Sequence, residues 1–191
     1  VINLAAGLSQ LNKKILVIDL DPQGNATTGL GLSNIDNSSD TIYGVLNGAK
    51  EIEGVIKKTK FDKLDIITSN VDLSGLEVET ADDTNRAFIL KTKLSLYLNN
   101  SRGSYDYVLI DCPPSLSLLT VMALVSSNSL LVPLQTEFFA LEGLTQLMKT
   151  IERIKVGLNP DLKIRGILLT MYDKRNKLSS QVEKEARDYF T

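Results

Sequence analysis

Hydrophobic side chains follow two kinds of pattern along this chain, and together they predict alternating strands and helices. Short runs that are apolar at nearly every position are typical of strands covered on both faces, and they occupy residues 15–19, 64–68, 107–111, 130–134 and 164–170. Apolar residues three or four positions apart predict amphipathic helices at residues 1–11, 86–98, 118–125, 137–155 and 178–190. This alternation predicts an α/β fold, with a doubly wound, mostly parallel sheet and helices on both of its faces.

The segments between these elements carry weaker signals. Gly, Asn, Ser and Thr are concentrated at 24–40, which predicts a loop, and 70–83 reads as an irregular acidic loop. Short helices are predicted at 41–46 and 51–58. Because no repeat, low-complexity tract or linker interrupts the chain, we expect a single domain over residues 1–191.

Two carboxylates stand where the first predicted strand ends. Asp19 and Asp21 precede Pro22, Gln23 and Gly24, a combination that favours a turn. Alternate residues of an extended chain point to the same side, so these acids would repel each other unless a cation or a hydrogen-bond donor lies between them. Ligands bind at the carboxyl ends of the strands in open α/β sheets, which makes this stretch a candidate ligand site. A plain strand exit, with the acids as turn formers, is the alternative interpretation.

A second strand end repeats the arrangement. Asp111 ends its apolar run and is followed by Cys112, Pro113 and Pro114. A carboxylate in this place fits the acid that holds Mg²⁺ against nucleotide phosphates, so the two strand ends together predict a magnesium–nucleotide site. The prolines suit either a rigid turn or a loop that pivots in response to a γ-phosphate. Cys112 is expected to be a small buried residue rather than a nucleophile, because the chain has no histidine to activate it.

Composition narrows the chemistry further. The chain has 191 residues, of which 43% are hydrophobic and 23% charged, and a net charge of −2, so it has no general basic surface. Binding of nucleic acid would need a local patch, and Lys174, Arg175 and Lys177 form either such a patch or a solvated loop. The absence of histidine and the single cysteine exclude histidine-based chemistry, an internal disulfide and a zinc site made by this chain alone. The cysteine usage fits a reducing cytosol, and no apolar run reaches the roughly 18 residues of a membrane span.

Four blocks of sequence, in this order, resemble the ParA/Soj family of chromosome and plasmid partition ATPases, part of the deviant-Walker-A group that also contains the MinD-like ATPases. The blocks extend over nearly the whole chain and read INLAAGLSQLNKKILVIDLDPQGNATTGLGL, YDYVLIDCPPSLSLLTVMAL, VPLQTEFFALEGLTQL and GILLTMYDKRNKLSSQV. The resemblance implies a P-loop NTPase domain that uses ATP and Mg²⁺ and forms a homodimer on ATP binding. It also implies non-specific DNA binding, a ParB-type centromere-binding partner that stimulates hydrolysis, and a cytoplasmic, nucleoid-associated protein without stable membrane association.

The same resemblance implies roles for individual residues. Asp21 matches the catalytic aspartate that orients the attacking water, and Asp19, Asp21, Pro22, Gln23 and Gly24 match switch I. Asp111 matches the Walker B aspartate, which holds magnesium through water, with Asp19 as a second candidate near the metal. Asp111, Cys112, Pro113 and Pro114 match switch II, and Arg175 matches a DNA-contacting arginine with Lys174 and Lys177 beside it.

Two parts of the family pattern lie outside these residues. The family has a phosphate loop of the form K-G-G-x-G-K-T-T-T directly before the segment that begins here with VINLAAG, and further segments after the helix at 178–190. We therefore expect the sequence as written to be truncated at both ends, without the first strand of the sheet. We also expect these 191 residues by themselves to bind ATP poorly or not at all, so that the function belongs to the intact protein.

Two other functions fit parts of the sequence. A MinD-like, membrane-cycling ATPase of cell division would need a basic and bulky apolar helix near its C-terminus, whereas 178–190 contains Glu183, Glu185 and Asp188. A non-catalytic binding module from a broken gene is the second alternative. The codons upstream of Val1 discriminate, because a phosphate loop there restores the enzyme and a stop codon supports the module.

Overall fold

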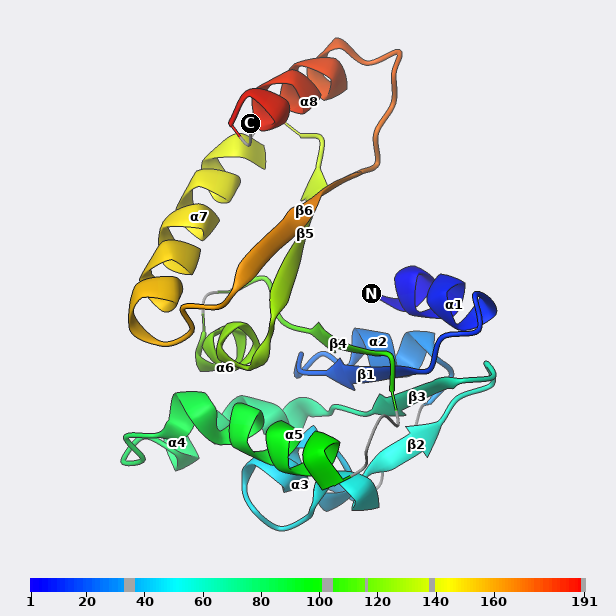
Figure 1. Ribbon diagram of the computed structural model, residues 1–191, viewed down its shortest axis with the longest axis vertical. Helices are drawn as coiled ribbons and strands as arrows, with labels where there is room; N and C mark the ends of the chain where they lie inside the picture. The colour runs from blue at the N-terminus through cyan, green and yellow to red at the C-terminus, as the bar shows by residue number, and fades with distance from the viewer. Residues whose placement is uncertain (33–36, 101–104, 116, 138–139, 190–191) are drawn as a thin grey trace. The chain divides into compact units, whose positions relative to one another are not determined.

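The computed structural model describes residues 1–32, 37–100, 105–115, 117–137 and 140–189 (Figure 1). Contacts divide the chain into two compact units, Val1–Ser126 and Ser127–Thr191, and each is considered by itself. The single domain expected from the sequence stays a prediction.

The first unit alternates strands with short and long helices. In chain order its elements are α1 (Ile2–Gln10), β1 (Ile15–Asp19), α2 (Asn25–Gly29), η1 (Ser38–Asp40), α3 (Ile42–Leu46), η2 (Ile52–Gly54), β2 (Ile56–Lys58), β3 (Leu64–Ile67), η3 (Val71–Gly75), α4 (Leu76–Glu79), η4 (Arg86–Phe88), α5 (Ile89–Asn100), β4 (Tyr107–Asp111) and α6 (Leu118–Ser126).

Four strands in the described part of this unit form one sheet in the order β2-β3-β1-β4. β1 lies in parallel between β3 and β4, and the short edge strand β2 pairs with β3 in the antiparallel direction. The predicted strands at 15–19 and 107–111 are confirmed to the residue. Each is a continuous apolar run that can be recognised from the local sequence alone. The mostly parallel sheet is confirmed as well.

Both faces of β1 are covered, as its uninterrupted apolar sequence requires. Leu16 and Ile18 belong to a core that includes residues of α3, α5 and α6. Ile15 and Val17 face the opposite core, which includes residues of α1 and α2. Figure 1 shows α1 and α2 on one side of this sheet and α3 and α5 on the other. Helices on both faces confirm the doubly wound prediction for this unit.

Two predicted segments of the first unit were wrong in detail. The helix expected over 51–58 is a single turn, η2, followed by β2, where Lys58 Nζ donates to the carboxylate of Asp65 on the neighbouring strand at 2.8 Å. The loop expected over 70–83 contains η3 and α4, because Leu73 and Leu76 are fully buried and hold this stretch against the core. Tertiary contacts, which no local pattern reports, decide both cases: pairing with β3 for β2, and burial in the core for η3 and α4.

The loop expected over 24–40 was also wrong at its start, where residues 25–29 form α2. Local propensity for a helix is low in Asn-Ala-Thr-Thr-Gly. The buried Ala26 and Leu30 pack in the core, and the carboxylate of Asp19 accepts the backbone N–H of Thr27. Part of the predicted loop, residues 33–36, lies outside the described residues.

The second unit contains a two-stranded parallel sheet of β5 (Ser129–Gln135) and β6 (Lys163–Thr170). α7 (Ala140–Gly157) connects these strands and contacts β5 and α8 (Lys177–Tyr189). The buried side chains of α7 recur at helical spacing: Leu144, Met148, Ile151 and Ile154. All four elements were predicted, although 138, 139 and 190, which the predicted helices included, lie outside the described residues.

Candidate active site

Asp19 ends β1 with a fully buried carboxylate. Its Oδ2 accepts hydrogen bonds from the backbone N–H and the Oγ1 hydroxyl of Thr27, each at 2.7 Å, and its Oδ1 accepts the backbone N–H of Asp21 at 3.2 Å. Burial raises the pKa of Asp19, the hydrogen bonds from Thr27 and Asp21 lower it, and the charge of Asp21 raises it. The protein itself therefore supplies donors to one of the two neighbouring acids.

Residues 20–24, which we call the β1–α2 loop, make a tight turn beside Asp19. The backbone N–H of Gln23 donates to Asp21 Oδ1 and that of Gly24 to the Asp21 carbonyl, both at 2.9 Å. Pro22 is half-buried and Gln23 exposed, while Gly24 adopts φ +63°, a conformation that favours glycine. Asp21 is left half-buried, and no hydrogen bond to its Oδ2 comes from the described residues.

β4 brings a third acid to the same edge of the sheet. Asp111 is the register partner of Asp19, and its carbonyl accepts the backbone N–H of Leu20 at 2.7 Å. Burial raises the pKa of the Asp111 carboxyl, and the charges of Asp19 and Asp21 raise it further. The three acids that the sequence placed at two separate strand ends thus meet at one carboxyl edge.

The residues after Asp111 leave this edge towards α6. Cys112 and Pro113 are half-buried and Pro114 is exposed. Burial, with the charges of Asp111 and Asp21, raises the pKa of the Cys112 thiol to about 11, so the thiol is protonated at neutral pH and a poor nucleophile. The Thr120 hydroxyl on α6 lies 3.2 Å from the Pro113 carbonyl, which ties this loop to the helix.

The donor chemistry of this edge suits a magnesium ion. Carboxylate oxygens are ligands that Mg²⁺ prefers, and a cation would offset the burial and the neighbouring negative charges that raise the pKa of Asp111. Asp19 fits a direct ligand less well, because its Oδ2 already accepts two hydrogen bonds. Within the described ranges, no three His, Cys, Asp or Glu side chains are arranged to hold a metal among themselves. The site therefore fits an ion that keeps several waters and is bound through one carboxylate and phosphate oxygens.

We predict that Asp111→Asn stabilises the full-length protein when nucleotide and Mg²⁺ are absent. A carboxyl whose folded pKa is raised destabilises the fold above that pKa, and the penalty disappears as the pH falls towards the unfolded value of 3.8. The gain should be on the order of 1 kcal/mol at pH 8, or about 2–4 °C in Tm, and should shrink by pH 4.5. Thermal unfolding at both pH values measures it, with the exposed Asp106→Asn as control. An equal gain at both pH values would contradict the prediction.

The predicted cationic loop lies in the second unit. Lys174, Arg175 and Lys177 are all exposed. The Arg175 guanidinium, with its side chain 90% exposed, binds both carboxylate oxygens of Asp173, with Nη2 at 2.8 Å from Oδ2. This contact lowers the pKa of Asp173. A phosphate that bound Arg175 would therefore compete with a carboxylate of the same loop.

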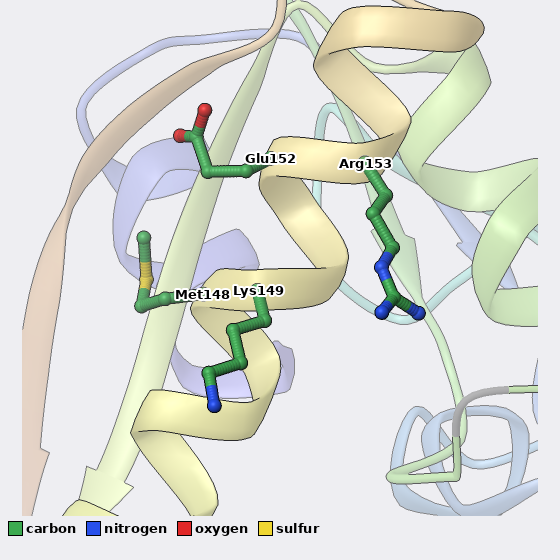
Figure 2. Close-up of a pocket in the computed structure, with 4 residues that line it drawn as sticks. All are labelled: Met148, Lys149, Glu152 and Arg153. Carbon is green, nitrogen blue, oxygen red and sulfur yellow. The ribbon is translucent and has the colours of Figure 1, made fainter.

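A hollow on α7 was not predicted from the sequence (Figure 2). It is lined by Met148, Lys149, Glu152 and Arg153, and Figure 2 shows Glu152 and Arg153 pointing to different sides of the helix. The hollow has neither paired carboxylates nor a strand end, so its chemistry does not match the acid cluster. Its exposed arginine offers a matched control for experiments on Arg175.

Sequence reasoning also missed two threonines that hold the acidic loops, Thr27 and Thr120. Each is buried: the Thr27 hydroxyl donates to Asp19 at the end of β1, and the Thr120 hydroxyl to the Pro113 carbonyl in the loop after β4. The signal in the sequence was a hydroxyl residue about eight or nine positions after Asp19 and after Asp111, and such residues are common in loops and helix starts.

The fold and the acid cluster define a class of protein, the α/β P-loop NTPases, and comparison with known proteins agrees. The family model described as AAA domain matches residues 1–164. The chain is 49% identical to the chromosome partitioning protein ParA of Caulobacter vibrioides over 99% of its length and 70% of that protein. It is 44% identical to the chromosome-partitioning ATPase Soj of Treponema pallidum, over 99% of this chain and 72% of the other. The chain therefore belongs to the ParA/Soj family of partition ATPases.

A solved structure gives the same fold. The cobyrinic acid a,c-diamide synthase of Mycobacterium smegmatis, crystallised with ADP and magnesium, superposes with a TM-score of 0.87 at 35% identity. The match covers 97% of this chain and 73% of that one. In the part of the chain that the structure describes, no helix is both long enough and apolar enough to cross a membrane.

Proposed function

We propose that this chain forms a single ATPase domain of a ParA-type partition protein, which hydrolyses ATP with Mg²⁺ during chromosome or plasmid segregation. The observation that carries the proposal is the meeting of Asp19, Asp21 and Asp111 at the carboxyl edge of a parallel sheet. Family membership supports it, and so does the solved neighbour that binds ADP and magnesium.

In this proposal the three acids have different tasks. Bound Mg²⁺ supplies positive charge that offsets the charge on the phosphates. Asp111, at the end of β4, would hold the metal through water. Asp19 keeps the β1–α2 loop in place through its contacts with Thr27 and Asp21. The free oxygen of Asp21 accepts a hydrogen bond from a water molecule and orients it for in-line attack on the γ-phosphate.

Hydrolysis by the full-length protein tests this assignment. We expect phosphate release that depends on Mg²⁺, with ATP turnover increased by DNA together with a ParB-type protein. Chelation of the metal should abolish turnover. Failure to bind or hydrolyse ATP under these conditions would refute the proposal.

We further propose that ATP binding forms a homodimer that binds DNA without sequence preference and places the protein on the nucleoid in the cytoplasm. The exposed Arg175, with Lys174 and Lys177 near it, is the proposed phosphate contact. These contacts add a salt-dependent affinity that carries no sequence information. We expect no stable membrane association, and the absence of ATP-dependent sedimentation with liposomes would support this.

We predict that Arg175→Ala weakens binding of the ATP-bound protein to all DNA sequences alike. Loss of one phosphate contact should reduce the slope of log K against log salt by about one. Fluorescence anisotropy with two unrelated duplexes at several salt concentrations measures both quantities. Arg153→Ala removes an equally charged, exposed side chain from α7 and should leave the slope unchanged. A change in sequence preference, or equal effects of the two variants, would contradict the role of Arg175.

A further inference from the structure

Thr27 uses every polar atom of its side chain and its backbone N–H within the acid cluster. It lies in the third position of α2 and is 3% exposed. Its backbone N–H and its hydroxyl both donate to the same oxygen of Asp19, at 2.7 Å each. Capping of the helix start needs only the hydrogen bond from the Thr27 backbone N–H to Asp19. The bond from the Thr27 hydroxyl is additional, and it goes to a charged acceptor.

The same hydroxyl also receives a hydrogen bond from a different strand. The backbone N–H of Ser69, two residues beyond the end of β3, donates to Thr27 Oγ1 at 3.0 Å. The Ser69 carbonyl approaches the N-cap of α2 as well, since a Cβ added to Gly24 would lie 3.4 Å from it. The beginning of α2 is therefore fixed between the ends of β1 and β3.

The contacts continue from Thr27 to the residue proposed to orient water. Thr27 holds Oδ2 of Asp19, and Oδ1 of Asp19 accepts the backbone N–H of Asp21. The direction of the Asp19 carboxylate thus fixes the peptide that carries Asp21. Because the whole path is buried up to Asp21, water cannot replace the Thr27 hydroxyl without local rearrangement.

We propose that Thr27 is a positioning residue for ATP hydrolysis, which acts by holding Asp19 and, through it, the peptide of Asp21. The inference rests on the function proposed above, because it needs Asp21 to act on water. Thr27 touches neither the phosphate nor the water in this account. A displacement of about 1 Å at a group that orients a reactant is enough to lower turnover by a large factor.

Substitutions that remove or keep the hydroxyl test the proposal in the full-length protein. Thr27→Val keeps the shape and removes the hydroxyl, and we expect kcat to fall about tenfold or more while KM and the affinity for ATP change less than about threefold. Thr27→Ser keeps the hydroxyl and should return kcat to within about threefold of the unchanged protein. Thr28→Val, at the exposed neighbouring threonine, is the matched control and should behave like the unchanged protein.

A double-mutant cycle with Asp21→Ala separates positioning from a general structural role. If Thr27 acts through Asp21, adding Thr27→Val to Asp21→Ala should lower the residual hydrolysis no further. Independent, multiplicative losses would overturn the inference, as would normal kcat in Thr27→Val. A parallel loss of ATP binding, turnover and Tm in both Thr27 variants would also overturn it, because that result indicates folding alone. Absence of hydrolysis in the unchanged protein would instead refute the proposed function.

Discussion

We expect Asp21→Ala to lower ATP hydrolysis by the full-length protein about a hundredfold or more, which corresponds to roughly 3 kcal/mol of activation free energy, and to leave ATP binding intact. The reason is that the half-buried Asp21 keeps one carboxylate oxygen without a hydrogen bond from the described residues, available for water, while the other is used by the turn. The variant should also accumulate as an ATP-bound dimer, because the hydrolysis that would separate the proposed dimer is blocked.

Single-turnover phosphate release and ATP binding, measured separately, check this prediction. Light scattering after size-exclusion chromatography follows the dimer. Asp62→Ala, at an exposed aspartate of the same unit, serves as the control and should hydrolyse ATP normally. Unchanged turnover in Asp21→Ala would show that Asp21 does not orient the attacking water. A loss of ATP binding would mean that Asp21 contributes mainly to binding ATP and not to the hydrolysis step.

We expect Asp19→Ala to lower the free energy of unfolding by about 3 kcal/mol, because it leaves the two buried donors of Thr27 and the partly buried N–H of Asp21 without an acceptor. Relief from burying a carboxylate offsets part of this loss, since burial raises the pKa of Asp19. Urea unfolding followed by circular dichroism measures the difference.

Asp106→Ala provides the comparison for this prediction. The Asp106 carboxylate also accepts a backbone N–H, from Lys14 at 2.8 Å, but in an exposed position where water can take its place. We expect that variant to lose less than about 1 kcal/mol. Equal losses in the two variants would show that Asp19 contributes no more than an ordinary surface acceptor.

The parts of the fold that the sequence predicted are those with a strong local pattern. The runs at β1 and β4 are apolar at every position before the final acid, and their boundaries were correct. α2 and α4 were missed because each depends on contacts with other parts of the chain: α2 on the carboxylate of Asp19, and α4 on the core in which its own Leu76 is buried. A four- or five-residue helix carries too few turns for its own periodicity to be visible.

The acid cluster was predictable for a related reason. Parallel strands place their carboxyl ends at one edge, so recognising the strands that end in Asp19 and Asp111 was enough to bring the acids together. The hydrogen bonds that orient those acids were not predictable, because Thr27 reaches Asp19 from eight residues away and Ser69 reaches Thr27 from another strand. The catalytic and DNA-binding roles of the individual residues stay predictions.

The half-buried Cys112 has a practical consequence for fluorescence studies of this protein. With a pKa of about 11, only about one thiol in ten thousand is ionised at pH 7, and alkylating dyes react with the ionised form. A cysteine introduced at the exposed position 174 would carry a thiol of ordinary acidity in open solvent. A dye could therefore be attached beside Arg175 selectively, without first replacing the native cysteine next to the acid cluster.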